Sequence, residues 1–313
     1  MDIGLKELKG LMEREGYISE DSLAVTVYLA LTLRKPLLVE GAPGVGKTEI
    51  AKVLGRVFNT EVIRLQCYEG LDENKALYEW NYQRQLLKIQ IMKDSCSRDA
   101  LEKDLFDEEY LLERPLLKAI RSDKKVVLLI DEVDKVDEPF EAFLFELLSD
   151  FQVSIPELGT LSALNIPIVV LTSNGDRELS DGLKRRCVYL YIDYPDIEKE
   201  VRILQIKVPE AGDRLRREVA AAVNYIRSNL DLRKQPSIAE TIDWARSLIA
   251  LDAESLEAEN FSNSVNLLLK NRDDRRQVLE SEVLREIIKN TTGENEHKRE
   301  AACNCHGHGH CHK

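Results

Sequence analysis

A single loop settles the fold class of this chain, and it reads Gly41-Ala42-Pro43-Gly44-Val45-Gly46-Lys47-Thr48. It matches the pattern G-x-x-x-x-G-K-[ST] at every fixed position. An apolar run, 36–40, precedes the loop, and a helix-like run begins at Glu49. Glycines let the backbone curl so that several N–H groups point at one anion, and the helix N-terminus adds a favourable partial charge. The alternative is a glycine-rich turn that only joins strand to helix. We predict a phosphate-binding loop.

The residues of this loop have separate roles. Lys47 brings a positive charge to the β- and γ-phosphates of a nucleotide, and the Thr48 hydroxyl is placed to bind Mg²⁺. The sequence therefore predicts ATP and Mg²⁺ as ligands. The predicted nucleotide contacts are Gly41, Ala42, Pro43, Gly44, Val45, Gly46, Lys47, Thr48 and Glu49.

The body of the chain alternates apolar, strand-like runs with segments of helix length. Besides 36–40, such runs occupy 61–65, 126–130, 166–171 and 188–192. This alternation implies right-handed crossovers and a mainly parallel five-stranded sheet with helices on both faces, an α/β fold. After Pro195 only helical periodicity remains, in 197–208, 214–230, 238–251, 255–269 and 275–289. We expect an α/β nucleotide-binding domain over 1–195, a small all-helical domain over 196–290, and a flexible tail over 291–313.

Two acids, Asp131 and Glu132, follow the fully apolar run 126–130. A carboxylate at the end of a buried strand can reach the Mg²⁺ shell, and we assign that role to Asp131. Glu132 is placed to orient or deprotonate the attacking water. We expect their strand to lie next to the strand that precedes the P-loop. The alternative is a solvated acidic turn.

Two more polar features complete the candidate site. The fourth strand ends in Thr172-Ser173-Asn174, and Asn174 would sit between the P-loop strand and the acidic strand, close enough to hold the lytic water. The alternative is a turn asparagine before Gly175. Arg185 and Arg186 precede the fifth strand, and arginine suits the charge on a transferring phosphoryl group. The alternative there is a solvated helix end.

The order of these features resembles the AAA+ ATPases. More narrowly, the stretches Glu40–Glu49, Arg64–Gly70 and Arg185–Pro195 look like the MoxR group. Pro236–Ala245 is similar to the branch of that group associated with carbon monoxide dehydrogenase maturation. The resemblance covers about residues 1 to 290.

The resemblance implies roles for residues that match the family's motifs. Lys47 and Thr48 correspond to Walker A, Asp131 and Glu132 to Walker B, and Asn174 to sensor 1. Arg185 or Arg186 would be the arginine finger, which reaches a neighbouring subunit's nucleotide and so implies a homo-oligomer, usually a hexamer. An insert in helix 2 would fall within 69–123 and a hairpin insert within 151–165.

One motif of the family is incomplete here. Many relatives open a lid helix with Ser-Pro-Arg, whose arginine is sensor 2. This chain has Lys234-Gln235-Pro236-Ser237 at that place, so that serine takes the arginine position. Arg233 or Lys234 could substitute.

The C-terminal tail is rich in metal-binding residue types. All five histidines lie in the last seventeen residues, and three cysteines accompany them. The composition is typical of a site for Zn²⁺, Ni²⁺ or Cu⁺, although the spacing is not that of a structural zinc finger. The alternatives are an incidental polar terminus or an appended tag. The tail residues are His297, Cys303, Cys305, His306, His308, His310, Cys311 and His312.

Composition limits the classes of function. The formal net charge of −12 does not suit a protein whose main task is gripping nucleic acid. The first residues show no basic segment followed by an apolar stretch, so we expect no secretory leader, and no apolar run comes near the ~20 residues that span a bilayer. We therefore expect a cytoplasmic protein with no membrane span and no nucleic-acid partner.

The resemblance implies ATP-driven remodelling of a client protein, during maturation or metal-cofactor insertion of a metalloenzyme. It also implies a von Willebrand factor A-type adaptor. A second hypothesis is a metallochaperone or metal store in which the P-loop acts as a regulatory switch. A third is a DNA-associated motor, which the acidic charge weakens.

Overall fold

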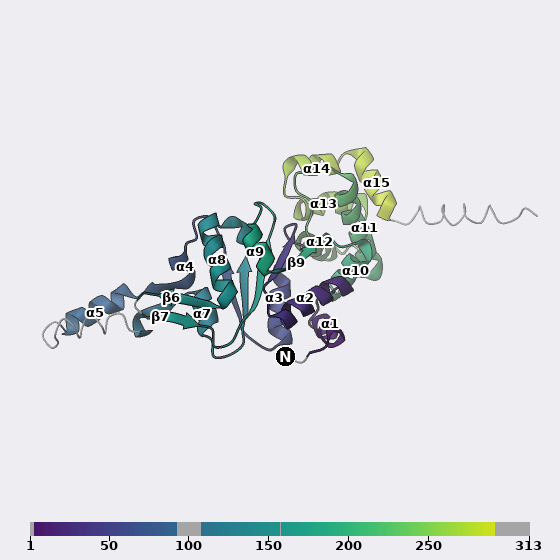
Figure 1. The fold of residues 1–313 in the computed structure, drawn as a ribbon. Helices are drawn as coiled ribbons and strands as arrows, with labels where there is room; N and C mark the ends of the chain where they lie inside the picture. Colours follow the sequence, from purple (N-terminus) through teal and green to yellow (C-terminus); the bar gives the residue numbers. More distant parts are fainter. Residues whose placement is uncertain (1–2, 93–107, 157, 292–313) are drawn as a thin grey trace, which may run out of the picture. The chain divides into compact units, whose positions relative to one another are not determined.

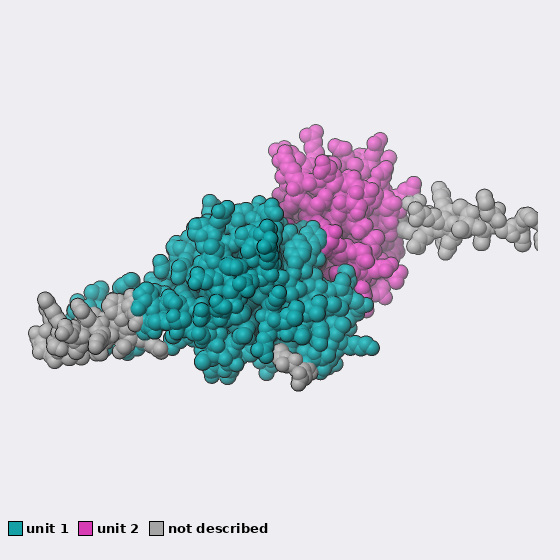
Figure 2. All heavy atoms as spheres, in the orientation of Figure 1, with its two compact units in different colours: residues 1–42, 46–192 teal, residues 43–45, 193–313 magenta. Residues whose placement is uncertain are grey.

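The computed structural model describes residues 3–92, 108–156 and 158–291. The chain divides into two compact units (Figure 2). Unit 1 comprises residues 1–42 and 46–192, and unit 2 comprises residues 43–45 and 193–313. Each unit has its own hydrophobic core.

A five-stranded parallel sheet forms the centre of unit 1. Its strands are β1 (Leu37–Gly41), β2 (Val62–Gln66), β5 (Val127–Asp131), β8 (Ile168–Ser173) and β9 (Val188–Ile192). The order across the sheet is β2-β5-β8-β1-β9, and every neighbouring pair is parallel. The predicted α/β class and parallel five-stranded sheet are confirmed.

The strand order corrects one detail of the prediction. β8 lies between β1 and β5, so the acidic strand is not the direct neighbour of the P-loop strand. All six residues of β8 are buried, as expected for a strand that has neighbours on both sides and helices on both faces of the sheet. The expected place of Asn174, between the P-loop strand and the acidic strand, is confirmed by the same order.

Helices flank the sheet. In Figure 1, α3 lies on one side of the sheet and α8 on the other. α3 begins directly after Gly46, whose φ of +99° is a left-handed conformation that favours glycine. α8 begins after Asp137, whose carboxylate accepts a hydrogen bond from the Phe140 N–H. The described helices of unit 1 are α1 (Leu5–Arg14), α2 (Asp21–Leu33), α3 (Lys47–Val57), α4 (Glu73–Leu77), α5 (Tyr82–Met92), α7 (Pro115–Arg121), α8 (Glu138–Asp150) and α9 (Asp181–Arg186).

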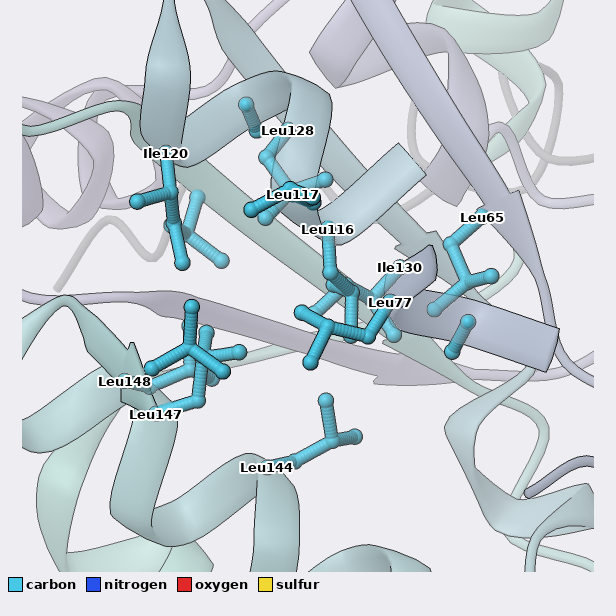
Figure 3. Packing of buried hydrophobic residues seen from close by; sticks show 14 of the residues in the cluster. Leu65, Leu77, Leu116, Leu117, Ile120, Leu128, Ile130, Leu144, Leu147 and Leu148 are labelled. Carbon is cyan, nitrogen blue, oxygen red and sulfur yellow. The ribbon is translucent and has the colours of Figure 1, made fainter. Parts of the chain in front are cut away.

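Leucine and isoleucine side chains fill the space between the sheet, α7 and α8 (Figure 3). Leu116 of α7 is fully buried, as is Leu144 of α8. Both belong to one cluster with Leu128 and Ile130 of β5. Burying a side chain of this size contributes about 1.5–3 kcal/mol, so this cluster fixes β5 and the acids at its end against the helices.

Two small antiparallel pairs extend unit 1. β3 (Tyr78–Trp80) pairs with β4 (Leu111–Glu113), and β6 (Gln152–Ile155) pairs with β7 (Gly159–Ser162). The β6–β7 hairpin falls within 151–165, where the resemblance implied one. The segment 69–123 holds α4, α5, the β3–β4 pair and α7.

Within its described residues, unit 2 contains helices joined by loops and no strand. Its helices are α10 (Ile197–Lys207), α11 (Asp213–Asn229), α12 (Ile238–Ala250), α13 (Ala258–Leu268), α14 (Arg272–Val278) and α15 (Ser281–Thr291). Its core includes Trp244 and Phe261, whose rings meet edge to face with centroids 5.4 Å apart. The single helix predicted over 275–289 is instead two helices, because Asn271 caps a short α14 and the chain turns before α15 begins.

None of the helices in the described ranges combines the length and the apolar character needed to cross a bilayer.

Candidate nucleotide site

Lys47 is the first residue of α3 and its side chain is buried. The ammonium Nζ donates hydrogen bonds to the carbonyl oxygens of Gly41, at 2.7 Å, and Ala42, at 2.8 Å. Its third hydrogen bond, of 2.8 Å, goes to Oδ1 of Asn174. The predicted P-loop lysine and the predicted sensor 1 residue are thus in direct contact, although 127 residues separate them in the sequence.

Opposing effects act on the charge of Lys47. Burial lowers the pKa of its ammonium, and the carboxylates of Asp134 and Asp131 raise it, with smaller effects from Glu132 and Asp176. The net direction is downward. A bound phosphate would add negative charge beside this ammonium and so favour its protonated form.

Asp131 is the hub of the site. Its side chain is nearly fully buried at the end of β5, and each of its two carboxylate oxygens accepts two hydrogen bonds. Oδ1 accepts from the hydroxyls of Thr48, at 3.0 Å, and Thr172, at 2.6 Å. Oδ2 accepts from Nε and Nη2 of Arg64, at 3.0 and 2.5 Å. The carboxylate is therefore fixed in one orientation.

The donor set at Asp131 fits Mg²⁺. The Thr48 hydroxyl oxygen and the Asp131 carboxylate lie within hydrogen-bond distance of each other, and both are hard oxygen ligands. Mg²⁺ usually binds one or two protein groups together with substrate phosphates and water. The residues that the structure describes contain no group of three or more His, Cys, Asp or Glu side chains that could hold a metal by themselves.

Glu132 has a left-handed backbone, with φ of +58°. Its N–H donates to the Thr172 hydroxyl at 2.9 Å, and its carboxylate Oε2 accepts from Nε2 of Gln66 at 3.1 Å. Left-handed φ is uncommon for a residue other than glycine and is often found at functional sites. The turn directs the Glu132 side chain towards β2, where Gln66 holds it.

Asp134 anchors the main chain around Asn174. Its Oδ2 accepts from the N–H groups of Asn174, at 3.1 Å, and Asp176, at 3.0 Å. The carboxylate is buried, and its Oδ1 has no hydrogen-bond partner within the described part of the chain. Asp134 therefore sets the position from which Asn174 reaches Lys47.

Three predicted site residues lie outside this cluster. The Glu49 carboxylate accepts a hydrogen bond of 3.0 Å from Arg56, one of two cations on α3 that pair with it. The Arg186 guanidinium lies 5.1 Å from the centroid of the Phe145 ring. Arg185 is exposed at the end of α9 and has no partner among the residues described.

The remaining predicted residues belong to the P-loop and to the C-terminal tail. Gly44 and Gly46 have left-handed φ values of +76° and +99°, so the loop uses conformations that favour glycine. Pro43, Gly44 and Val45 group with unit 2 by their contacts. The tail residues, from His297 to His312, lie outside the described ranges.

The stretch 233–237, where the resemblance places sensor 2, makes several contacts with other residues of unit 2. The Ser237 hydroxyl accepts from the Glu240 N–H, and the Glu240 carboxylate accepts from the Ser237 N–H, which forms a capping box for α12. Arg233 pairs with Asp273 at 3.0 Å and Lys234 with Glu240 at 3.3 Å. Ser237 thus serves as a helix cap.

The sequence analysis gave no role to four residues of the site: Arg64, Gln66, Thr172 and Asp134. A signal existed for the first two, because residues two apart on a strand share a face and β2 carries polar residues at 64 and 66. In the structure Gln66 lies opposite Asp131 in the β2–β5 register. The role of Asp134 depends on a contact across 40 residues, which no local pattern reveals.

Comparisons with known proteins support this arrangement. Residues 36–187 match the family model described as the AAA domain of the dynein-related subfamily. An uncharacterized protein of Staphylococcus aureus (strain USA300) is 23% identical over 256 residues, which cover 77% of this chain and 86% of the relative. An uncharacterized protein of Staphylococcus haemolyticus (strain JCSC1435) is 25% identical over 258 residues, with the same coverage of both chains.

Solved structures of RuvB are also similar to this chain. The Thermotoga maritima RuvB Holliday junction branch migration motor has a TM-score of 0.47 and 14% identity, over 85% of this chain and 71% of that one. A mutant of the same protein has a TM-score of 0.49 and 15% identity, over 87% and 74%. The stretch that matches the family model, residues 36–187, includes the P-loop, Asp131 and Asn174.

Proposed function

We propose that this chain binds ATP with Mg²⁺ and hydrolyses it at the carboxyl edge of the unit 1 sheet. The observation that carries the proposal is the joint placement of Lys47, Asp131 and Asn174. Lys47 contacts Asn174, while Asp131 contacts the Thr48 hydroxyl one residue beyond Lys47. Phosphoryl transfer requires a cation that binds the phosphates, a carboxylate that binds the metal and a polar group that positions the attacking water. Lys47, Asp131 and Asn174 are side chains of these three kinds.

Each residue has a role that its geometry allows. The Lys47 ammonium exchanges its carbonyl acceptors for phosphate oxygens when the nucleotide enters, because charge-assisted hydrogen bonds to phosphate are the stronger ones. Thr48 and Asp131 would hold Mg²⁺, which supplies charge neutralisation between the β- and γ-phosphates. Glu132 leaves Gln66 to orient and deprotonate the attacking water, and Asn174 holds that water.

Replacing Glu132 by glutamine tests the hydrolysis step. We expect Glu132→Gln to bind ATP with unchanged affinity and to lose turnover by at least about a hundredfold, the usual size of a general-base effect. Glu146→Gln, at an exposed position of α8, is the matched control and should keep full turnover. Turnover that survives in Glu132→Gln would show that another residue activates the water.

A separate variant tests nucleotide binding. Lys47→Ala removes the ammonium that we assign to the phosphates, and we expect ATP affinity to fall by at least about tenfold, as for the loss of one strong charged contact. Equilibrium dialysis or calorimetry measures it. Unchanged affinity would contradict a phosphate site at this loop.

We further propose a cytoplasmic homo-hexamer in which Arg185 is the arginine finger and the unit 2 helices act as a lid. Family resemblance supports the ring. Arg185 is the better candidate for the finger because it is exposed and has no partner in the described ranges, whereas Arg186 stacks on Phe145. Arg185→Ala should assemble and bind ATP but lose turnover, while Arg186→Ala should keep most of it. The reverse result would make Arg186 the finger.

The work done by hydrolysis is proposed from the resemblance alone. It is the remodelling of a client metalloenzyme during maturation or metal-cofactor insertion, together with a von Willebrand factor A-type adaptor. Isolation of native partners on the Glu132→Gln variant, loaded with ATP, tests this. Recovery of neither a metalloenzyme nor such an adaptor would contradict it.

The Cys- and His-rich tail supports the alternative of a metallochaperone or metal store for Zn²⁺, Ni²⁺ or Cu⁺. Truncation after Thr292 separates the two functions. A remodelling ATPase should keep its basal turnover and much of its activity on the client, whereas a metal carrier should lose its function.

A further inference from the structure

A cavity of about 700 Å³ opens in unit 1 at the amino-terminal edge of the sheet. Its walls come from α2, from the segment 163–170 that leads into β8, and from Lys125 just before β5. Leu37, the first residue of β1, also lines it, whereas the P-loop begins at the other end of that strand. Five strand residues span roughly 16 Å, so the cavity is separate from the nucleotide site.

Three cations line this cavity: Arg34, Lys35 and Lys125. Within the described ranges none of the three has a carboxylate partner. This is unusual in a chain whose 56 acidic residues exceed its 44 basic ones. Burial, and next the charge of Arg34, lower the pKa of Lys125, so two of these cations act on each other. Repulsion of this kind is relieved when an anion binds between the groups.

The backbone that carries the cations is fixed by hydrogen bonds. Arg34 ends α2 in a left-handed conformation with φ of +53°, and the Lys35 N–H donates to the Ala30 carbonyl at 3.0 Å. The Lys125 carbonyl accepts from the Thr60 hydroxyl. On the facing wall, Asn165 Nδ2 donates to the Asp123 carbonyl at 2.8 Å. The cavity is thus largely preformed, and only the ends of the cationic side chains need to move.

We propose that this cavity binds a small polyanion, a molecule with two or more phosphate or carboxylate groups that pair with Arg34, Lys35 and Lys125. Its volume falls in the usual range of small-molecule sites, about 300–1,000 Å³. The concave shape favours a small molecule over an extended chain. Apolar residues that line the cavity, among them Val27, Ala30 and Leu31, would contact the uncharged part of the ligand.

Calorimetry on two chemically different anions tests the site. The probes are pyrophosphate and citrate, in metal-free buffer, and the full-length chain carries Lys47→Ala so that the P-loop does not compete. We expect one equivalent of at least one probe to bind. The dissociation constant should rise by at least about tenfold when Arg34→Gln, Lys35→Gln and Lys125→Gln are added together, because each lost charge removes a strong contact. The probe that binds distinguishes a phosphate ligand from a carboxylate ligand.

Two further variants sharpen the result. A control set, Lys207→Gln, Arg217→Gln and Lys270→Gln, removes the same charge from exposed positions of unit 2 and should leave binding unchanged. Ile166→Trp keeps all three cations but narrows the cavity that Ile166 lines, and should also weaken binding. Binding that persists in Ile166→Trp would place the anion on the outer surface.

Three outcomes overturn the proposal. They are binding of neither probe at millimolar concentration, equal binding with and without the three cations, and full binding in Ile166→Trp. None depends on ATP turnover, so the result is independent of the proposed ATPase function.

Discussion

Arg64 pairs with the Asp131 carboxylate, which we propose as a ligand of Mg²⁺. The guanidinium donates two hydrogen bonds to Oδ2, and the Thr48 hydroxyl lies at Oδ1. Arg64 is about half exposed, whereas Asp131 is nearly fully buried, so the ion pair satisfies a buried charge from its solvent side. A positive charge at one carboxylate oxygen lowers the attraction of the other for a cation.

This contact predicts how Arg64 affects metal binding. In Arg64→Gln the Asp131 carboxylate loses its competing cation, and we expect the Mg²⁺ concentration for half-maximal ATP turnover to fall by about threefold to tenfold, which corresponds to ~0.7–1.4 kcal/mol. Steady-state ATPase assays over a Mg²⁺ titration measure it.

Arg56→Gln is the control for that titration. Arg56 also forms ion pairs in unit 1, with Glu15 and Glu49, but none with Asp131. Its Mg²⁺ dependence should match that of the unaltered chain. A half-saturating concentration that stays the same or rises in Arg64→Gln would mean that the guanidinium assists the metal site.

Residues differ in how far the sequence alone predicts their place in the site. Lys47, Asp131 and Asn174 are recognised because each stands in a short local pattern at the end of an apolar run. Arg64 and Thr172 act through Asp131, which lies 67 and 41 residues away along the chain. Their roles depend on strand order and register, and these follow from packing of the whole sheet rather than from local pattern.

At the level of elements, α8 fixes the segment that follows Asn174. Glu141 of α8 is buried, and its carboxylate accepts hydrogen bonds from the Ser180 N–H, at 2.5 Å, and from Arg177, at 2.7 Å. Ser180 in turn caps α9, the helix that carries Arg185. One side chain of α8 therefore helps to position both the segment that follows Asn174 and the helix that carries the proposed arginine finger.

Removing the charge of the Glu141 carboxylate should destabilise unit 1 by an amount that depends on pH. Burial raises the pKa of Glu141, but hydrogen bonds from Ser180 and Arg177 outweigh it, and the net shift is downward. Because the folded pKa is lower than the unfolded value of about 4.3, the stabilisation is present above that pH and is lost as pH falls through the folded pKa. We expect Glu141→Gln to lower the free energy of unfolding by about 2–4 kcal/mol at pH 7. In this variant the free energy of unfolding should also change less as the pH falls towards 3.

Urea denaturation between pH 3 and 7 measures both effects. Glu146→Gln, an exposed change on the same helix, should leave stability within about 0.5 kcal/mol. If Glu141→Gln unfolds with the same pH dependence as the unaltered chain, the two hydrogen bonds do not hold the carboxylate in its charged form.

The elements also show where sequence patterns lose accuracy. Strand β9 has the predicted bounds, and the other four strands of the sheet are displaced by one or two residues at their ends. The error at α14 and α15 has a local cause. Apolar periodicity continues through 275–289, but it does not report the turn at 279–280 that ends α14. Periodicity detects which face is buried and not whether the helix is continuous.

At the scale of the whole molecule, the two units differ in where their buried charged side chains lie. Unit 1 concentrates its buried acids at Asp131, Asp134 and Glu141, where they serve or surround the candidate site. Unit 2 contains an ion pair between Glu200 of α10 and Arg227 of α11, with two hydrogen bonds of 2.8 and 3.0 Å. Both side chains are almost completely buried.

Arg227 connects several parts of unit 2. Besides Glu200, its guanidinium donates to the Pro236 carbonyl at 2.8 Å and to the Thr241 hydroxyl at 3.3 Å, and it lies 4.7 Å from the centroid of the Tyr194 ring. These contacts join α10 and α11 to the start of α12. Loss of Glu200 would leave this buried cation without its counter-charge.

We therefore expect Glu200→Ala to destabilise unit 2 by about 3–5 kcal/mol, the usual cost of an uncompensated buried charge. The double change Glu200→Leu with Arg227→Met should cost much less, because it removes both charges and keeps most of the volume. As a control, Asp243→Ala breaks only the exposed pair with Arg246 and should lower the free energy of unfolding by less than about 1 kcal/mol. We expect calorimetry with ADP present to distinguish the units, because ADP bound at the proposed site of Lys47 and Thr48 should raise the unfolding temperature of unit 1. If Glu200→Ala lowers the unfolding temperatures of both units equally, or changes neither, the Glu200–Arg227 pair does not stabilise unit 2 by itself.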